Sequence, residues 1–188
     1  MPTALRYPSA SAYGELALPA EPRFLEPGRG RIVREGRDNT LAILSVGGRL
    51  RECLVAAAEL EQYGVSATVA DARWVKPLDE KLLSMLATDH KVLLTVEENS
   101  IGGFSAQVHQ TLLEGGHLDG IGRTPLVIRS LMFPDRWIDH NQPFLQYDDA
   151  GLNANQIVAK ACATLERAGI KLSEDVANDD RAVRIARA

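Results

Sequence analysis

The sequence lacks the features that mark membrane proteins and nucleic-acid-binding proteins. No apolar stretch approaches the roughly 20 residues that a membrane-spanning helix needs, and no basic segment followed by a hydrophobic one begins the chain. The formal net charge is −4 and there is no long basic run, which argues against nucleic acid and anionic membrane surfaces as partners. We therefore expect a soluble protein of the cytoplasm, or of the plastid if the source has plastids.

Cysteine is also scarce. The chain of 188 residues has two, Cys53 and Cys162, and each lies on the apolar face of a segment with helical spacing. Neither has a second cysteine or a histidine at the spacing of metal ligands. We expect both to be small core residues in a reducing compartment, and we expect no metal site.

Sequence motifs for catalysis are missing as well. Neither Gly-x-Gly-x-x-Gly after a strand nor Gly-x-x-x-x-Gly-Lys-Ser/Thr occurs, so the two commonest phosphate loops are excluded. Gly47-Gly48, at a strand–helix junction, can admit an anion at a helix N-terminus or serve only tight packing. No two histidines have ligand spacing, and each is expected to be a surface or a satisfied core residue. These are His90, His109, His117 and His140. The residues alone therefore predict no self-sufficient active site.

What the chain does contain is an alternation of strand and helix patterns between two irregular ends. Residues 1–30 hold five prolines and three glycines without a sustained period, which predicts an extended lead-in that belongs to something larger. Residues 31–168 carry the periodic segments of one domain. Residues 169–188, rich in Asp and Arg, predict a polar tail.

The periodic segments predict an α/β fold. Residues 31–35 and 40–46 are expected to form a β-hairpin around a turn at 36–39. Further strands are predicted at 65–71, 91–96 and 125–131, and helices at about 50–63, 79–88, 104–114 and 153–168. We expect a three-layer domain with a mainly parallel sheet of about five strands, covered on both faces, and one antiparallel strand at an edge.

The chain is organised around residues 91–104, KVLLTVEENSIGGF. The apolar run 91–96 has the pattern of a strand buried on both faces, and it ends in the carboxylates Glu97 and Glu98 before a Gly102-Gly103 turn. Ligands and partners meet an open α/β sheet at the carboxyl ends of its strands. The two carboxylates are therefore functional or part of an interface, or else they are solvated loop acids beside a structural turn.

Two further polar clusters follow predicted strands. In the segment 71–77, DARWVKP, Arg73 suits a phosphate because its planar guanidinium can bond two oxygens, but an ion pair with Asp71 or Glu98 is equally consistent with the spacing. The segment 133–140, FPDRWIDH, mixes aromatic and charged residues as protein interfaces do, with Trp137 and His140 as interface candidates.

Six segments of the chain resemble the C-terminal domain of the 1-deoxy-D-xylulose-5-phosphate synthase family, thiamine diphosphate enzymes of the transketolase superfamily. They occur in the family's order and span about residues 3–168. They are RYP at 6–8, GRGRIVREG at 28–36, ADARWVKPLDE at 70–80, VEENSIGGF at 96–104, FPDRWIDH at 133–140 and AGLNANQIVAK at 150–160.

The resemblance implies a function for the whole enzyme and a limited part for this chain. The family condenses pyruvate with glyceraldehyde 3-phosphate, with loss of CO2, to begin isoprenoid precursor synthesis. Its Gly-Asp-Gly segment for thiamine diphosphate and Mg, and its activating glutamate, belong to the first two of three domains. By resemblance, Arg6 and Arg73 match the arginines that hold the phosphate of the acceptor aldehyde.

From this resemblance we expect a domain without catalytic residues or a cofactor of its own. Its partners would be other domains of the same enzyme and a second subunit, contacted near Glu97, Glu98, Trp137 and His140. The family continues RYP with Arg-Gly, whereas this chain has Ser9-Ala10. A free-standing, non-catalytic interaction domain derived from the family is therefore the alternative, whereas the segment 70–80 disfavours a β-subunit of a 2-oxo acid dehydrogenase.

Overall fold

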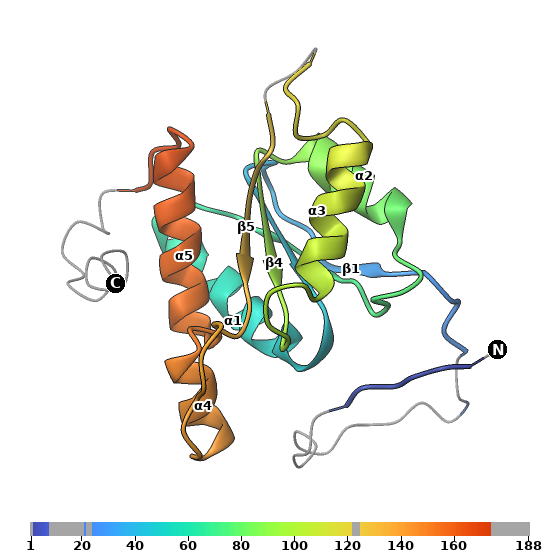
Figure 1. Ribbon diagram of the computed structural model, residues 1–188. Coiled ribbons are helices and arrows are strands. Elements are labelled where there is room, and N and C mark those ends of the chain that lie inside the picture. Colours follow the sequence, from blue (N-terminus) through green and yellow to red (C-terminus); the bar gives the residue numbers. More distant parts are fainter. Residues whose placement is uncertain (1, 8–20, 22–23, 122–124, 174–188) are drawn as a thin grey trace.

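The computed structural model describes residues 2–7, 21, 24–121 and 125–173 of the chain. A five-stranded sheet lies between two layers of helices (Figure 1). The strands are β1 (Arg31–Arg34), β2 (Leu41–Ser45), β3 (Thr68–Asp71), β4 (Val92–Val96) and β5 (Val127–Leu131). Their order is β1-β3-β2-β4-β5, with every pair parallel except β1 and β3. The predicted fold class is confirmed.

Helices cover both faces of this sheet. The longer ones are α1 (Leu50–Glu59), α2 (Glu80–Asp89), α3 (Phe104–Glu114) and α5 (Ala154–Arg167). α1 and α5 pack on one face and α2 and α3 on the other. Because side chains alternate along a strand, Leu41 and Ile43 of β2 enter the first core, and Ala42 and Leu44 enter the second. This explains why the central strands are continuously apolar in sequence.

The predicted β-hairpin is wrong. β1 does not pair with β2; it lies antiparallel to β3, with Arg31 opposite Asp71, and β3 separates it from β2. An Arg31 Nε–Asp71 Oδ2 contact of 3.3 Å supports this register. The turn signal at 36–39 is local, whereas strand pairing is decided by burial, and β3 places buried residues between two neighbours. The expectation of one antiparallel edge strand is confirmed.

Most predicted helix ends are confirmed. Asp79 begins α2 by accepting a hydrogen bond from the backbone N–H of Leu82. Gly64 ends the 3-10 turn after α1, Leu60–Tyr63, at φ 74°, a left-handed conformation that glycine adopts without strain. α4 (Pro143–Asp149) was not predicted, because none of its residues is buried and it has no apolar stripe.

Both cysteines are buried in the core, as predicted. Burial raises the pKa of the Cys53 thiol to about 12 and that of Cys162 to about 11, so neither is a thiolate at neutral pH. Among the described residues, no helix is long and apolar enough to cross a membrane.

Three partly or fully buried polar side chains connect α3 to the sheet, and one of them should make stability depend on pH. The Thr95 hydroxyl donates to Ser130 Oγ at 2.8 Å, and Ser130 Oγ lies 3.4 Å from His109 Nε2. Burial lowers the pKa of His109 below its usual 6.5. As the pH falls through 6.5, the unfolded chain takes up this proton first, so stability should decrease down to the lowered pKa. Urea unfolding at pH about 7.5 and about 5.5 measures the change in the free energy of unfolding. His109→Gln should reduce the pH dependence, and an unchanged dependence would contradict this assignment.

Candidate functional site

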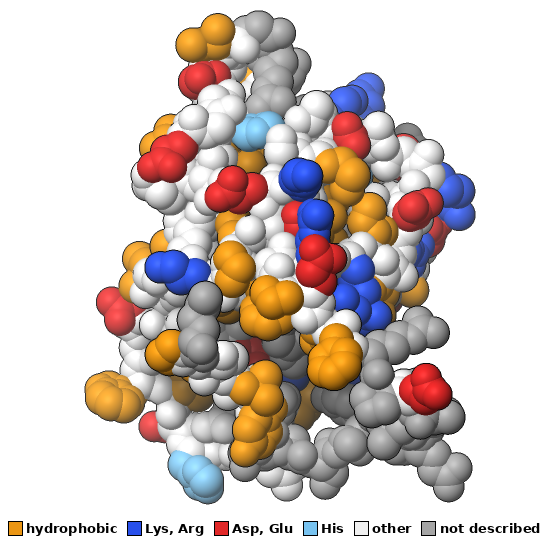
Figure 2. Space-filling model, turned by 90° about the vertical axis from the view of Figure 1, so that its right-hand side faces the viewer, with side chains coloured by type: hydrophobic (Ala, Val, Ile, Leu, Met, Phe, Trp, Pro, Cys, Tyr) orange, Lys and Arg blue, Asp and Glu red, His pale blue; other side chains and the backbone are white. Residues whose placement is uncertain are grey.

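The polar loops of the domain gather at the carboxyl edge of the sheet, where β2, β3, β4 and β5 end. This edge lies in the lower half of Figure 1, near α4 and the N-terminal segment. Figure 2 shows that hydrophobic side chains also gather in the lower half of one face. Large exposed apolar residues of the segments at this edge include Leu5, Tyr7, Ile101, Trp137 and Phe144. The edge thus combines charged groups with an exposed apolar surface.

Glu97 is a structural residue within the domain. Its side chain is buried, and its two oxygens accept hydrogen bonds from the backbone N–H groups of Phe104 and Ser105, each at 2.7 Å. The carboxylate therefore satisfies the free N–H groups at the start of α3, and its negative charge interacts favourably with the positive end of the helix dipole. It is not the solvated loop acid that we considered. Glu97 is only 1% exposed, so its side chain cannot contact a partner directly. It can contribute to an interface only by holding the loop after β4 in position.

The Gly102-Gly103 turn allows Glu97 to reach the helix. Gly102 has φ 90°, a conformation that other residues rarely adopt. A Cβ on Gly103 would overlap the Glu97 carboxylate. Each glycine is thus required for a different reason, and together they bring the start of α3 down onto the acid that follows β4.

Glu98 belongs to a second cluster, with Arg49 and Tyr147. Arg49 Nε donates to Glu98 Oε1 at 3.2 Å, and the Tyr147 hydroxyl donates to the same oxygen at 2.8 Å. The guanidinium of Arg49 lies 3.6 Å from the centre of the Tyr147 ring, a cation–π contact. Burial, together with the hydrogen bond to Glu98, raises the pKa of Tyr147. The cluster ties the loop after β4 to the start of α1 and to α4.

Sequence reasoning did not find Arg49 or Tyr147. Their contacts join residues 49 positions apart, which no local pattern reveals. The available signal was Gly47-Gly48, after which the chain turns into α1 and buries Arg49. A Cβ on Gly47 would lie 3.6 Å from Glu98 Oε2, so this glycine lies against the cluster.

The Tyr147 hydrogen bond can be tested by one substitution. Tyr147→Phe keeps the ring beneath Arg49 but removes a hydroxyl bonded to a carboxylate, so we expect a loss of about 1–2 kcal/mol in the free energy of unfolding. Tyr7→Phe, at an exposed ring, should change it by less than about 0.5 kcal/mol. Urea unfolding checks both values. Equal stability of the two variants would show that the Tyr147 hydroxyl contributes nothing.

Arg73 follows β3 in an unusual backbone conformation. Its φ is 57°, the left-handed region, which is uncommon for residues other than glycine and frequent at functional sites. Its backbone N–H donates to Asp71 Oδ1 at 3.1 Å, and its Nε lies 3.7 Å from Asp71 Oδ2. Of the two ion pairs that the spacing allowed, the structure thus has the one with Asp71. Asp71 is shared with Arg31, and the Arg73 side chain remains partly exposed at the edge.

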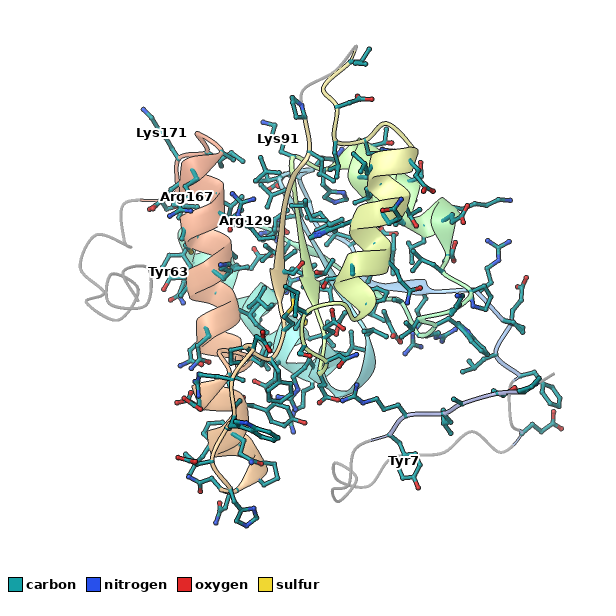
Figure 3. All side chains as sticks on the ribbon, viewed as in Figure 1. Tyr7, Tyr63, Lys91, Arg129, Arg167 and Lys171 are labelled. Atoms are coloured by element: carbon teal, nitrogen blue, oxygen red, sulfur yellow. The ribbon has the colours of Figure 1, made fainter. Side chains whose placement is uncertain are left out.

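Arg6 reaches the same edge from the far end of the sequence. Its guanidinium donates to the backbone carbonyl of Glu98 at 2.5 Å, while the side chain stays exposed. Figure 3 shows the N-terminal segment running below the sheet, with Tyr7 pointing away from it. Arg6 and Arg73 thus approach from opposite sides of the end of β2, since β3 and β4 flank that strand.

The segment 133–140 and α4 form one unit, which we call the α4 projection (residues 133–150). Arg136 donates to both carboxylate oxygens of Asp149, at 2.9 and 2.7 Å, which raises the pKa of Arg136 and lowers that of Asp149. The rings of Phe133 and Tyr147 lie 5.8 Å apart. Trp137 is 97% exposed and His140 is exposed, so both remain available as interface residues.

The groups at the carboxyl edge are suited to contacts with a ligand or with another surface. Within the described ranges, no group of three His, Cys, Asp or Glu side chains could hold a metal ion. The conspicuous groups at the edge are two exposed or partly exposed guanidiniums and an apolar surface on a fixed scaffold. Guanidinium groups suit anions, and a mixture of apolar and charged residues suits protein interfaces.

Comparison with known proteins agrees with this class. The chain belongs to the family of the transketolase C-terminal domain, whose family model, "Transketolase, C-terminal domain", matches residues 28–157. The matched range contains all five strands, Arg73 and the α4 projection, but not Arg6.

Solved structures show the same relationship. A split-gene transketolase described as an inactive β4 tetramer is 31% identical, with a TM-score of 0.65 over 76% of this chain and 44% of that one. The transketolase of Campylobacter jejuni subsp. jejuni NCTC 11168 shares the fold at 15% identity and a TM-score of 0.52, over 76% of this chain and 20% of that one. The chain thus spans less than half the length of either protein.

Proposed function

We propose that this chain is the C-terminal domain of a 1-deoxy-D-xylulose-5-phosphate synthase, which condenses pyruvate with glyceraldehyde 3-phosphate and releases CO2. In this proposal the domain holds the phosphate of the acceptor aldehyde through Arg73 and Arg6 and supplies interface surface to the enzyme. The observation that carries the proposal is the convergence of these two arginines, 67 positions apart, on one edge of the sheet.

The spacing of the strands supports a shared anion. β3 and β4 are both neighbours of β2, and adjacent strands lie about 4.8 Å apart, so their ends are separated by about 10 Å. Two arginine side chains reaching inward across that distance can contact opposite sides of one phosphate. Asp71 pairs with both Arg73 and Arg31. If Arg73 turns toward a ligand, Arg31 therefore still neutralises the Asp71 carboxylate.

The cofactor site of the synthases does not fit the residues of this chain. The Asp-Gly pair here, Asp119-Gly120, follows Leu118 instead of glycine. Asp119 Oδ1 accepts a hydrogen bond from the Ile121 N–H in a loop before β5, away from the carboxyl edge. We therefore assign thiamine diphosphate and Mg to other domains of the enzyme and derive no step through them here.

The isolated chain should accordingly not bind thiamine diphosphate tightly. Calorimetry with the cofactor and Mg2+ is expected to show no micromolar binding, and the chain alone should not turn over pyruvate. The reason is that, in the synthase family, the segment that holds the diphosphate and the glutamate that activates the thiamine ring belong to the other two domains. A micromolar Kd would contradict the proposed division of labour.

A free-standing interaction domain is the second candidate, and one contact favours it. Arg73 already has Asp71 as an ion-pair partner, so a purely structural role is available to it. Reading the gene sequence upstream of Met1 for a Gly-Asp-Gly motif separates the two candidates.

The proposed activity is tested by assembling this chain with the polypeptide that carries the cofactor-binding domains. We expect pyruvate decarboxylation to be stimulated by glyceraldehyde 3-phosphate in the assembled enzyme. Assembly without any such stimulation would favour the interaction domain.

A further inference from the structure

The two ends of the domain differ in charge, and both carry exposed apolar residues. The α4 projection has four aspartates and one arginine, a formal net charge of −3. Because Arg136 is paired with Asp149, its remaining carboxylates are those of Asp135, Asp139 and Asp148. They surround three large exposed apolar residues, Trp137 at 97%, Phe144 at 64% and Leu145 at 46%.

The projection is held in one shape before any partner arrives. Tyr147 anchors it to Glu98 and Arg49, as described above. Gln146 Nε2 donates to the Asp139 carbonyl at 3.2 Å, and Asn153 Nδ2 donates to the Phe144 carbonyl at 3.2 Å. Because its side chains start from a fixed backbone, less conformational freedom is lost when the surface binds.

The opposite end of the sheet carries cations. Figure 3 shows Lys91, Arg129, Arg167 and Lys171 in the upper half of the domain, around β5 and the end of α5. Lys91 lies beside the start of β5, since its carbonyl accepts from the Val127 N–H at 3.1 Å. In the described part of the chain, none of the four cations forms an ion pair. Carboxylates at this end are Asp89 and Glu166, beside the cations in sequence, and Glu114 and Asp119, beside the apolar residues of the loop before β5. This end is therefore close to neutral, whereas the α4 projection has a net charge of −3.

This end also offers apolar contact and an open strand edge. Leu113, in the last turn of α3, is 58% exposed, and Ile121, in the loop before β5, is 81% exposed. β5 pairs with β4 on one side and with no other strand in the described ranges. We call these two residues, with the four cations, the amino-end patch.

We propose that the α4 projection of one copy of this chain docks on the amino-end patch of a second copy, so that the copies associate head to tail. Charge decides between the possible contacts. A two-fold contact between two projections would place aspartates against aspartates, whereas the head-to-tail contact places them near Arg and Lys side chains that form no ion pair among the described residues. Trp137 is the expected anchor, because exposed Trp residues and arginines contribute most to protein interfaces. The inference goes beyond the proposed activity and does not depend on it.

The test is sedimentation velocity of the full chain, up to about 0.3 mM, which covers contacts as weak as those of transient complexes. We expect concentration-dependent association that weakens about tenfold when the ionic strength is raised from about 0.05 to about 0.5 M, because salt screens exposed charges. A strict monomer would overturn the proposal. Association that strengthens with salt would also overturn it, because it would indicate an apolar contact between surfaces of the same charge.

Two variants then test the geometry. The double variant Trp137→Ser with Asp139→Asn alters only the projection, and the double variant Arg129→Gln with Arg167→Gln alters only the patch. All four side chains are exposed, and circular dichroism checks that both variants fold. Each variant alone should be monomeric. An equal mixture should form dimers and nothing larger, because it contains one intact projection and one intact patch per pair. A mixture that stays monomeric would overturn the head-to-tail arrangement, as would association of either variant alone at the level of the unmodified chain.

Discussion

Replacing Arg73 with alanine in the assembled enzyme is expected to raise the KM for glyceraldehyde 3-phosphate roughly ten- to a hundredfold. A charge-assisted hydrogen bond contributes on the order of 1.5–3 kcal/mol, which converts to that range in affinity. The KM for pyruvate should change little, because its carboxylate has no part in the proposed phosphate site. Arg73→Lys should recover only part of the loss, since an ammonium group cannot bond two oxygens in a planar fork. Steady-state kinetics with each substrate measures all three effects.

Arg31→Ala is the matched control for this experiment. Arg31 contacts the same carboxylate, Asp71, at 3.3 Å, but it lies on β1 and is not assigned to the phosphate. The Arg31→Ala variant should have a KM for the aldehyde within about twofold of that of the unmodified enzyme, because an exposed ion pair contributes only about 0–1 kcal/mol. If Arg73→Ala lowers the thermal stability and leaves the KM unchanged, Arg73 is a structural partner of Asp71 and the assignment of the phosphate site is wrong.

Replacing Glu97 with alanine is expected to destabilise the domain by about 3–6 kcal/mol. Two buried backbone N–H groups would lose a charged acceptor at 2.7 Å, and each such bond contributes on the order of 1.5–3 kcal/mol. Glu97→Gln should cost less, because its carbonyl oxygen can still accept one of the two bonds. Urea unfolding monitored by circular dichroism gives the free energies.

Glu114→Ala provides the comparison for Glu97. Glu114 is the same residue type at the other end of α3, but it is exposed, and within the described ranges its carboxylate accepts a hydrogen bond from Gln110 alone. Its replacement should change the free energy of unfolding by less than about 0.5 kcal/mol. If Glu97→Ala is no more destabilising than Glu114→Ala, the carboxylate does not hold the start of α3.

The sequence predicts those features of the fold that depend on local spacing. β4 and α3 follow from a continuous apolar run and from the helical spacing of Phe104, Val108 and Leu112, all of which are buried. The pairing of β1 with β3 depends on residues 40 positions apart, and a good turn signal at 36–39 predicts the wrong neighbour. α4 has no buried residue, so its first-turn Pro143 was its only clear signal.

The candidate site divides in the same way. The positions of Glu97, Glu98 and Arg73 at strand ends follow from the strand pattern, because polar residues directly after buried strands must lie at the edge. The roles of these residues do not follow from the strand pattern. Whether a carboxylate caps a helix or contacts a partner depends on which groups the fold brings close to it. Glu97 meets the first N–H groups of α3, whereas Glu98, one residue later, meets Arg49 and Tyr147 from two other elements.

The most direct measurement of the proposed phosphate site is a comparison of two acceptor aldehydes in the assembled enzyme. The rate of CO2 release from pyruvate is measured as a function of glyceraldehyde 3-phosphate and, separately, of unphosphorylated glyceraldehyde. If two arginines hold the phosphate as proposed, its removal should raise the KM at least about a hundredfold, and Arg73→Ala should narrow that difference. Equal use of both aldehydes, or a difference that Arg73→Ala leaves unchanged, would contradict the assignment of Arg73 to acceptor binding.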